Sequence, residues 1–272
     1  MLKNISLMAL LFSNFAFAQK SELVQNDVFG NPIFIEESMQ KARIRMMHIE
    51  GYDQEYYTKS TYNTAGNPTK RDYFDEEGNV SFSESFNYND TNKLASRELK
   101  NTDESLIFNF DYEYTPEGYI LTKSENDVNV VKIEYKLDQN QNITYEHESN
   151  LLEDNDIFIE KNHLYQNGFL VKTQVKYNQG SYTLDYKNDA KGNPIEEIYL
   201  DKDNKAVNKY LRKFDDNNNM TEEVTLDETG KVKQISTIKY QYDNHKNWKK
   251  RTQYVKNFDQ PISNTTRTIR YE

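Results

Sequence analysis

The sequence predicts an all-β protein, built as an elongated, strongly twisted or rolled antiparallel sheet of tandem hairpins. A turn motif recurs along the whole chain, apolar and polar residues alternate between the turns, and no long segment shows the period of a helix. Together these three features indicate about 17 hairpin turns with a repeat unit of about 26 residues.

The turns are marked by an acidic or amide residue that is followed three positions later by glycine and then by asparagine. Clear copies begin at Asp27, Asn63, Asp75 and Asp189, and in weaker copies another residue replaces the glycine. The first side chain can bond the backbone two residues on, and glycine or asparagine tolerates the positive φ of a tight turn. We therefore predict structural turns at Gly66, Gly78, Gly118, Gly168, Gly192 and Gly230.

The turns form two interleaved series. Taken at the glycine position, the first runs through positions 66, 92, 118, 141, 168, 192, 218 and 246, and a second turn falls between successive members. An apolar residue or proline follows each position by two, and an apolar residue often precedes it by four. These residues would meet across a hairpin on one face, so the apolar pattern keeps register with the turns.

Between the turns, several segments alternate strictly, including Phe108 to Tyr114, Tyr182 to Tyr186 and Ile238 to Tyr242. One face is aromatic or aliphatic and the other is polar, as expected of a half-buried antiparallel strand. The best helical candidate, Glu36 to Met47, also alternates apolar and basic residues, so it fits a strand at least as well.

About 18 strands at ~4.8 Å spacing would give a flat sheet of ~85 Å, which sheets do not sustain without twisting or rolling. An outer-membrane barrel is the competing architecture, and it needs an outward apolar band on each strand. The segment Lys231 to Tyr242 carries polar residues on both faces in its middle, which argues against that membrane barrel.

Composition narrows the possible partners. The 272 residues include 34 basic and 44 acidic side chains, and this net charge of −10 disfavours a nucleic-acid partner. Cysteine is absent, which excludes disulfides, thiolate metal sites and cysteine catalysis. Only 36% of the residues are hydrophobic, so we expect a thin core.

Residues 1–18 resemble a secretory signal peptide. Lys3 supplies the positive charge, a mostly apolar stretch follows, and Ala16-Phe17-Ala18 forms a cleavage site before Gln19. We expect an exported protein, periplasmic or extracellular, with no membrane span after cleavage. Residues 19–272 are predicted to form a single domain, with an irregular part at 19–60, repeats at 61–254 and a C-terminal cap at 255–272.

The segment Tyr240 to Arg251 reads YQYDNHKNWKKR and resembles the pattern YxYDxxGNWxKR of YD-repeat, or Rhs-type, bacterial proteins. Lys246 stands where that pattern has glycine, and the copies within 120–185 are eroded, although the resemblance extends over residues 60–272. It implies β-hairpin repeats, which in longer members wrap into shells around toxin cargo, and some members are linked to carbohydrate binding. No functional residue is transferred by the motif, and no cargo segment follows the repeats in this sequence.

The sequence holds no recognisable catalytic or metal motif. His48, His147, His163 and His245 have no metal-ligand spacing, and no nucleophile elbow, P-loop or dinucleotide motif occurs. The acidic turn at Asp138 begins like a calcium loop but lacks the required glycine and glutamate, so turn formation explains it. We therefore predict no enzyme, no metal and no cofactor.

The sequence offers one compact basic and aromatic cluster, at Trp248, Lys249, Lys250 and Arg251. It predicts either a contact with an anionic or glycan partner or, preferably, a terminal cap in which the ring closes the sheet and the cations protect the last edge. The tyrosine side chains also allow two interpretations: their rings could stack on sugars, or they could form the core of the repeat. We favour the core.

The leading hypothesis for function is an exported, non-catalytic repeat protein that offers a binding or scaffolding surface to an unknown protein or carbohydrate. An immunity or accessory factor that pairs with a YD-repeat toxin is the alternative, and an enzyme ranks third.

Overall fold

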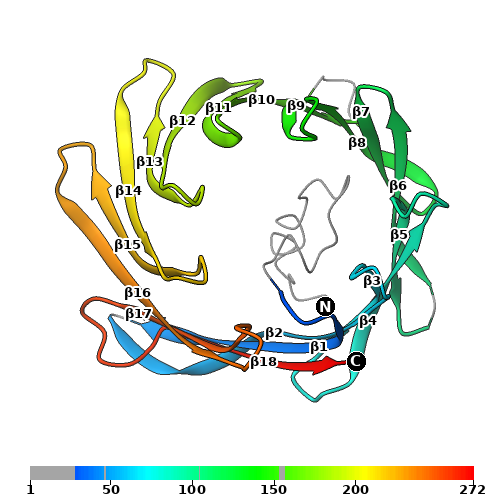
Figure 1. The fold of residues 1–272 in the computed structure, drawn as a ribbon, viewed down its shortest axis with the longest axis horizontal. Helices are drawn as coiled ribbons and strands as arrows, with labels where there is room; N and C mark the ends of the chain where they lie inside the picture. The colour runs from blue at the N-terminus through cyan, green and yellow to red at the C-terminus, as the bar shows by residue number, and fades with distance from the viewer. Residues whose placement is uncertain (1–27, 46, 104, 153–156) are drawn as a thin grey trace.

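The computed structural model describes residues 28–45, 47–103, 105–152 and 157–272. These residues form eighteen antiparallel strands arranged around a barrel (Figure 1). No helix among them is long and apolar enough to cross a membrane. The strands are β1 Pro32–Arg45, β2 His48–Tyr62, β3 Pro68–Phe74, β4 Val80–Tyr88, β5 Leu94–Asn101, β6 Leu106–Thr115, β7 Gly118–Glu125, β8 Val128–Leu137, β9 Ile143–Asn150, β10 Phe158–Gln166, β11 Phe169–Tyr177, β12 Gly180–Asn188, β13 Pro194–Leu200, β14 Ala206–Phe214, β15 Met220–Asp227, β16 Val232–Tyr242, β17 Trp248–Val255 and β18 Ser263–Tyr271.

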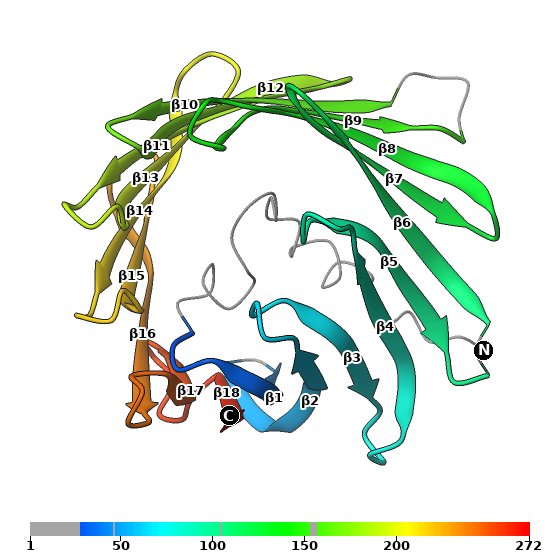
Figure 2. The ribbon, with the colours of Figure 1, turned by 45° about the vertical axis from the view of Figure 1, so that its right-hand side comes forward.

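The barrel is closed. Each strand pairs with its neighbours in sequence, and β1 pairs with β2 on one side and with β18 on the other (Figures 1 and 2). The predicted all-β antiparallel fold is confirmed, but the predicted elongated, twisted or rolled sheet is a closed barrel. Because twist of one hand accumulates from strand to strand, the two ends meet and satisfy each other's unpaired backbone groups.

Successive turns alternate between the two ends of the barrel, so the two predicted series correspond to two rims. We call the end with the turns at 66, 92, 118, 141, 168, 192, 218 and 246 the first rim, and the opposite end the second rim. Gly66, Gly78, Gly168, Gly192 and Gly230 all have positive φ. The weaker copies share this geometry, since Asn92, Gln141, Asn218 and Lys246 have φ of 60°, 66°, 62° and 68°.

Gly118 differs from the other predicted turn glycines. It begins β7 rather than occupying a left-handed turn position. A Cβ at this residue would lie 2.0 Å from the carbonyl oxygen of Tyr135 on β8. The close approach of two backbones, and not a positive φ, therefore requires glycine here.

The acidic or amide residue that begins each regular turn caps the turn's own backbone. In the turn between β12 and β13, Oδ1 of Asp189 accepts the backbone N–H groups of Lys191 at 2.8 Å and of Asn193 at 2.9 Å, and the Asn193 amide donates to Oδ2 at 2.9 Å. These hydrogen bonds, led by the one from the Asn193 side chain, lower the pKa of Asp189. The side chain thus fixes the turn that reverses the chain.

Gly192→Val is expected to cost on the order of 1–2 kcal/mol of unfolding free energy or more, measured by urea unfolding. Gly192 has φ 91°, and an added Cβ would lie 2.5 Å from the ring of Phe169. Gly230→Ala isolates the backbone effect, because no atom lies within 4 Å of its added Cβ. Lys191→Ala should cost little, and an equal loss for Lys191→Ala and Gly192→Val would contradict the predicted turn.

Alternate residues of each strand point to opposite faces of the wall. One face holds most of the buried side chains, including the cluster Tyr119, Leu121, Ile133 and Tyr135. Side chains converge on the inside of a closed cylinder and diverge on its outside, so we assign this face to the interior. The core is a layer of side chains lining the wall, in agreement with the thin core expected from composition.

The two ends of the chain form regular strand. The described part of residues 19–60, where an irregular segment is predicted, contains β1 and most of β2, and Glu36 to Arg45 is strand rather than helix. The predicted cap at 255–272 is mainly β18, which lies between β17 and β1. The signal peptide predicted at 1–18 lies outside the described residues.

Candidate functional site

The cluster predicted at residues 248–251 is divided between the two faces. In the ladder of β16 and β17, Arg251 pairs with Tyr240 and Lys250 with Gln241, and then the register shifts so that Trp248 pairs with Tyr242. Lys249 is the extra, exposed residue of this bulge. Trp248 and Arg251 therefore lie on the inner face and Lys250 on the outer face, so the four residues do not form one contact patch.

Trp248 lies at the seam of the barrel, which we define as the region where β17, β18 and β1 pair and close the sheet. The Arg267 guanidinium of β18 lies 3.6 Å from the centre of the indole ring, and the ring of Tyr240 lies 6.5 Å away. The ring is half-buried. The predicted terminal cap needs correction, because β18 and then β1 continue the sheet beyond β17 and leave no last edge to protect.

Arg267 also joins the last strand to the first. Its guanidinium contacts Oε2 of Glu37 on β1 at 2.5 Å through Nη2 and at 2.7 Å through Nε. The Tyr56 hydroxyl on β2 donates to the other oxygen of the same carboxylate. Burial first, and then the Glu37 charge, raise the pKa of Tyr56 well above its usual range, which keeps the phenol protonated as a donor.

Asn247 holds the same seam at the first rim. Its amide accepts the backbone N–H of Phe29 at 2.8 Å and donates to the Phe29 carbonyl at 2.8 Å, as a strand residue would. It also donates to the Tyr271 hydroxyl at 2.8 Å, and Tyr271 donates to Asp243. Burial and the bond to Asp243 raise the pKa of Tyr271 to about 12.

Charged residues continue around the inner face as mutually paired groups. Glu84 is 2% exposed, and it accepts from Tyr73 at 3.1 Å and contacts Arg97 at 3.2 Å. Further along, Arg212 bridges Glu197 at 2.9 Å and Glu223 at 2.8 Å. Because these opposite charges lie side by side on neighbouring strands, their attraction helps to hold the wall together.

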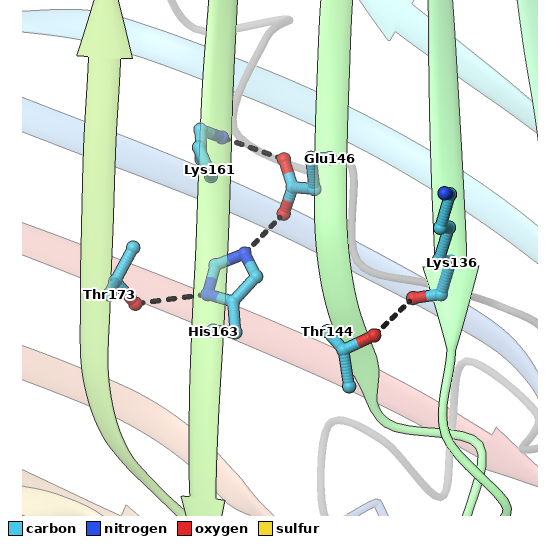
Figure 3. Close-up of polar contacts among 6 residues, drawn as sticks. All are labelled: Lys136, Thr144, Glu146, Lys161, His163 and Thr173. Atoms are coloured by element: carbon cyan, nitrogen blue, oxygen red, sulfur yellow. Dashed lines mark hydrogen bonds and ion pairs between the residues drawn. The ribbon is translucent and has the colours of Figure 1, made fainter.

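The inner face of β9 to β11 holds a relay of hydroxyl, imidazole and carboxylate (Figure 3). His163 Nδ1 lies 2.9 Å from the Thr173 hydroxyl, and Nε2 lies 3.1 Å from Oε1 of Glu146. Lys161 donates to Oε2 of Glu146 at 2.8 Å. This order of groups is that of a nucleophile, a base and an orienting acid. Thr173 is only 4% exposed, so its hydroxyl is shielded from a substrate, and the relay acts as a cross-strand bridge.

The relay predicts a pH dependence of stability. Burial would raise the pKa of Glu146, but hydrogen bonds from His163 and Lys161 outweigh burial and hold the pKa below its usual range. The stabilisation is therefore complete above the ordinary glutamate pKa of about 4.3 and is lost as pH falls through the lower folded-state pKa. We expect Glu146→Gln to cost about 1–2 kcal/mol near pH 7 in urea unfolding.

The difference between wild type and Glu146→Gln should shrink below about pH 4, where the wild-type carboxyl also becomes neutral. Glu113→Gln at an exposed position of β6 is the control, because no ion pair or hydrogen bond involves its side chain among the described residues. A difference that stays constant down to the acid limit of folding would contradict the assignment.

The other candidate ligand residues do not assemble into a metal site. No group of three or more His, Cys, Asp and Glu side chains within the described ranges is placed to hold a metal ion. Asp138 instead accepts the backbone N–H groups of Asn140 at 2.8 Å and Asn142 at 2.9 Å, and His245 stacks on Tyr271. Turn formation accounts for the acidic residue that begins like a calcium loop.

No family model matches this chain, and no curated protein matches its sequence. Among solved structures, it is similar to a porin-like protein from Bacteroides uniformis, with 8% identity over 89% of this chain and 97% of that one, at a TM-score of 0.47. It is also similar to TcdB2-TccC3 without its hypervariable C-terminal region, with 10% identity and a TM-score of 0.29, over 88% of this chain and 16% of that one.

The geometry defines the class of protein as an 18-stranded, antiparallel, closed β-barrel. The resemblance to YD-repeat proteins stays a prediction, since no family model matches.

Proposed function

We propose that this chain is an exported, non-catalytic β-barrel whose outer wall is a binding or scaffolding surface for a protein or a glycan. The observation that carries the proposal is the difference in solvent exposure between the two faces. The inner face holds most of the buried side chains, and its Glu197, Arg212 and Glu223 group is largely shielded from solvent. The outer face is the broad surface that is left for a partner.

The chemistry of the outer face supports an aqueous location. Adjacent strands carry exposed or half-buried ion pairs, such as Lys209 with Glu196 at 2.9 Å and Lys213 with Glu222 at 2.8 Å. A charged residue at the lipid-facing middle of a barrel costs about 2–4 kcal/mol. The wall is therefore suited to water rather than to a bilayer, which agrees with export to the periplasm or the exterior.

The closed barrel makes the alternative function, an immunity or accessory factor, less favoured. Pairing with the repeats of a toxin by strand addition needs an exposed sheet edge. The two edges that a linear repeat sheet would expose, on β1 and β18, pair with each other. The surface-binding role is favoured for this reason.

The test uses the full chain with its leader, tagged after Glu272, in an exporting bacterial host. We expect the protein in the periplasmic or extracellular fraction, and alkaline carbonate should release any membrane-associated portion. Cross-linking followed by purification should recover a protein or glycan partner. Retention in the carbonate-washed membrane would overturn the aqueous location, and turnover of a substrate by the purified barrel would overturn the non-catalytic role.

A further inference from the structure

A polar groove of about 580 Å³ lies beside the second rim, over β10, β11 and β12. Its floor is formed by the outer-face residues of these strands, and the turn between β13 and β14 lines one side through Asp201, Lys202 and Asn204. This volume is within the range of small-molecule sites.

The floor is a regular grid of polar side chains. The strand registers place Asn162, Gln174 and Thr183 in one row, and Glu160, Lys176 and Ser181 in the next. Each row spans three strands and therefore about 10 Å. Elsewhere on the outer face, the corresponding positions include aliphatic residues, as at Ile198 and Leu211 on β13 and β14, so the grid is a local feature.

The grid has unused hydrogen-bonding capacity. The side chains of Gln174, Ser181 and Thr183 make no hydrogen bond to another described residue. Together they offer an amide, which both donates and accepts, and two hydroxyls that do the same. A ligand rich in hydroxyl groups matches this mixture, because each of its hydroxyls can also act as donor and acceptor.

The charge of the lining is balanced. The two carboxylates of Glu160 and Asp201 are matched by the two ammonium groups of Lys176 and Lys202. A strongly anionic or cationic ligand would gain no net attraction from this balance.

We propose that this groove binds a neutral oligosaccharide. The amide and hydroxyl groups of the grid exchange hydrogen bonds with the sugar hydroxyls across the three strands. The inference rests on the proposed binding role of the outer wall and names the ligand class and the place.

Isothermal titration calorimetry on the mature full-length barrel tests it with a fixed panel. Maltohexaose, cellohexaose, xylohexaose, mannohexaose and N-acetylchitohexaose are the neutral probes, and oligogalacturonate and fully deacetylated chitohexaose are the anionic and cationic comparators. We expect at least one neutral probe to bind, and to bind more tightly than either charged comparator at physiological ionic strength.

Gln174→Ala and Thr183→Val should each weaken that binding by about five- to tenfold, as expected for the loss of one hydrogen bond. Gln241→Ala is the matched control, since Gln241 is an exposed outer-face residue of β16, and it should leave affinity unchanged. Thermal unfolding of each variant verifies that it is folded before titration.

Three results would overturn the proposal: no binding by any neutral probe, tighter binding of a charged comparator, or neutral binding that folded groove variants retain. Failure of every neutral probe to bind, together with recovery of a protein partner by cross-linking, would reject the groove while leaving the wider binding role intact. If cross-linking recovers no partner and no probe binds in the titrations, both the sugar-binding groove and the binding role of the outer wall are rejected.

Discussion

Replacing Arg267 by alanine is expected to lower the free energy of unfolding by about 3–5 kcal/mol, because it leaves a largely buried carboxylate without its partner. The side chains of Arg267 and Glu37 are 15% and 19% exposed, and their ion pair joins β18 to β1. The substitution also removes the cation over the Trp248 ring. Urea unfolding followed by circular dichroism measures the loss.

Two further variants identify the cause of the stability loss in Arg267→Ala. Arg270→Ala, on the outer face of the same strand, removes an exposed guanidinium that lies over the Phe34 ring and should cost about 1 kcal/mol or less. The double variant Glu37→Met and Arg267→Met replaces both charges and should recover much of the stability, because no buried charge is left unpaired. Equal losses for Arg267→Ala and Arg270→Ala would show that the ion pair does not hold the seam.

Trp248→Ala is expected to cost about 3 kcal/mol, because the ring fills the inner face of the seam between Tyr240 and Arg267. A role as an exposed partner contact predicts the opposite, with unchanged stability and a lost partner. Urea unfolding followed by circular dichroism measures the free energy of unfolding of the variant. Lys249→Ala at the exposed bulge is the control, and its free energy of unfolding should change little.

The wild-type protein offers an independent measurement of the same point, since Trp248 is its one tryptophan. The half-buried indole should emit at shorter wavelength than free tryptophan and resist quenching by acrylamide. Emission at the wavelength of free tryptophan, with easy quenching in the folded protein, would place the ring in solvent and contradict its role in the seam.

The repeated turns made much of the fold predictable. A capping side chain and a residue that tolerates positive φ act within five residues, so the sequence around Asp189 or Asp215 is sufficient to indicate a hairpin. Strand alternation then follows from the turn register. The same local rule holds at Lys246, which has φ 68° although it is neither glycine nor asparagine.

Closure was not predictable from these local rules. It depends on contacts between the two ends of the chain, such as Asn247 with Phe29 and Arg267 with Glu37, which no turn signal encodes. The bulge at Lys249 is a second example, because one extra residue moves Trp248 and Lys250 to opposite faces. A cluster that is compact in sequence is therefore divided in space.

The relay of Glu146, His163 and Thr173 shows what the sequence could still have revealed. Its residues match no motif, and they lie on three strands. Yet a hairpin that turns at Gly168 places His163 opposite Thr173, as the ladder shows. Pairing residues across each predicted turn would have brought these groups together. The groove beside the second rim could not have been found by pairing residues across turns alone. The turn between β13 and β14 lines it, and the position of that turn depends on the twist of the wall.

The pairing of β1 with β18 joins residues that are distant in sequence, such as Glu37 and Arg267, which are 230 positions apart. Chain synthesis delivers β1 first, so the edge of β1 that pairs with β18 has no partner until the final strand has followed. Contacts of such high sequence separation form slowly, and an open strand edge is exposed to pairing with other chains in the meantime. This barrel therefore depends on protection of its first strand until β18 has been made, and a chain shortened before β18 would present two unpaired strand edges instead of a closed wall.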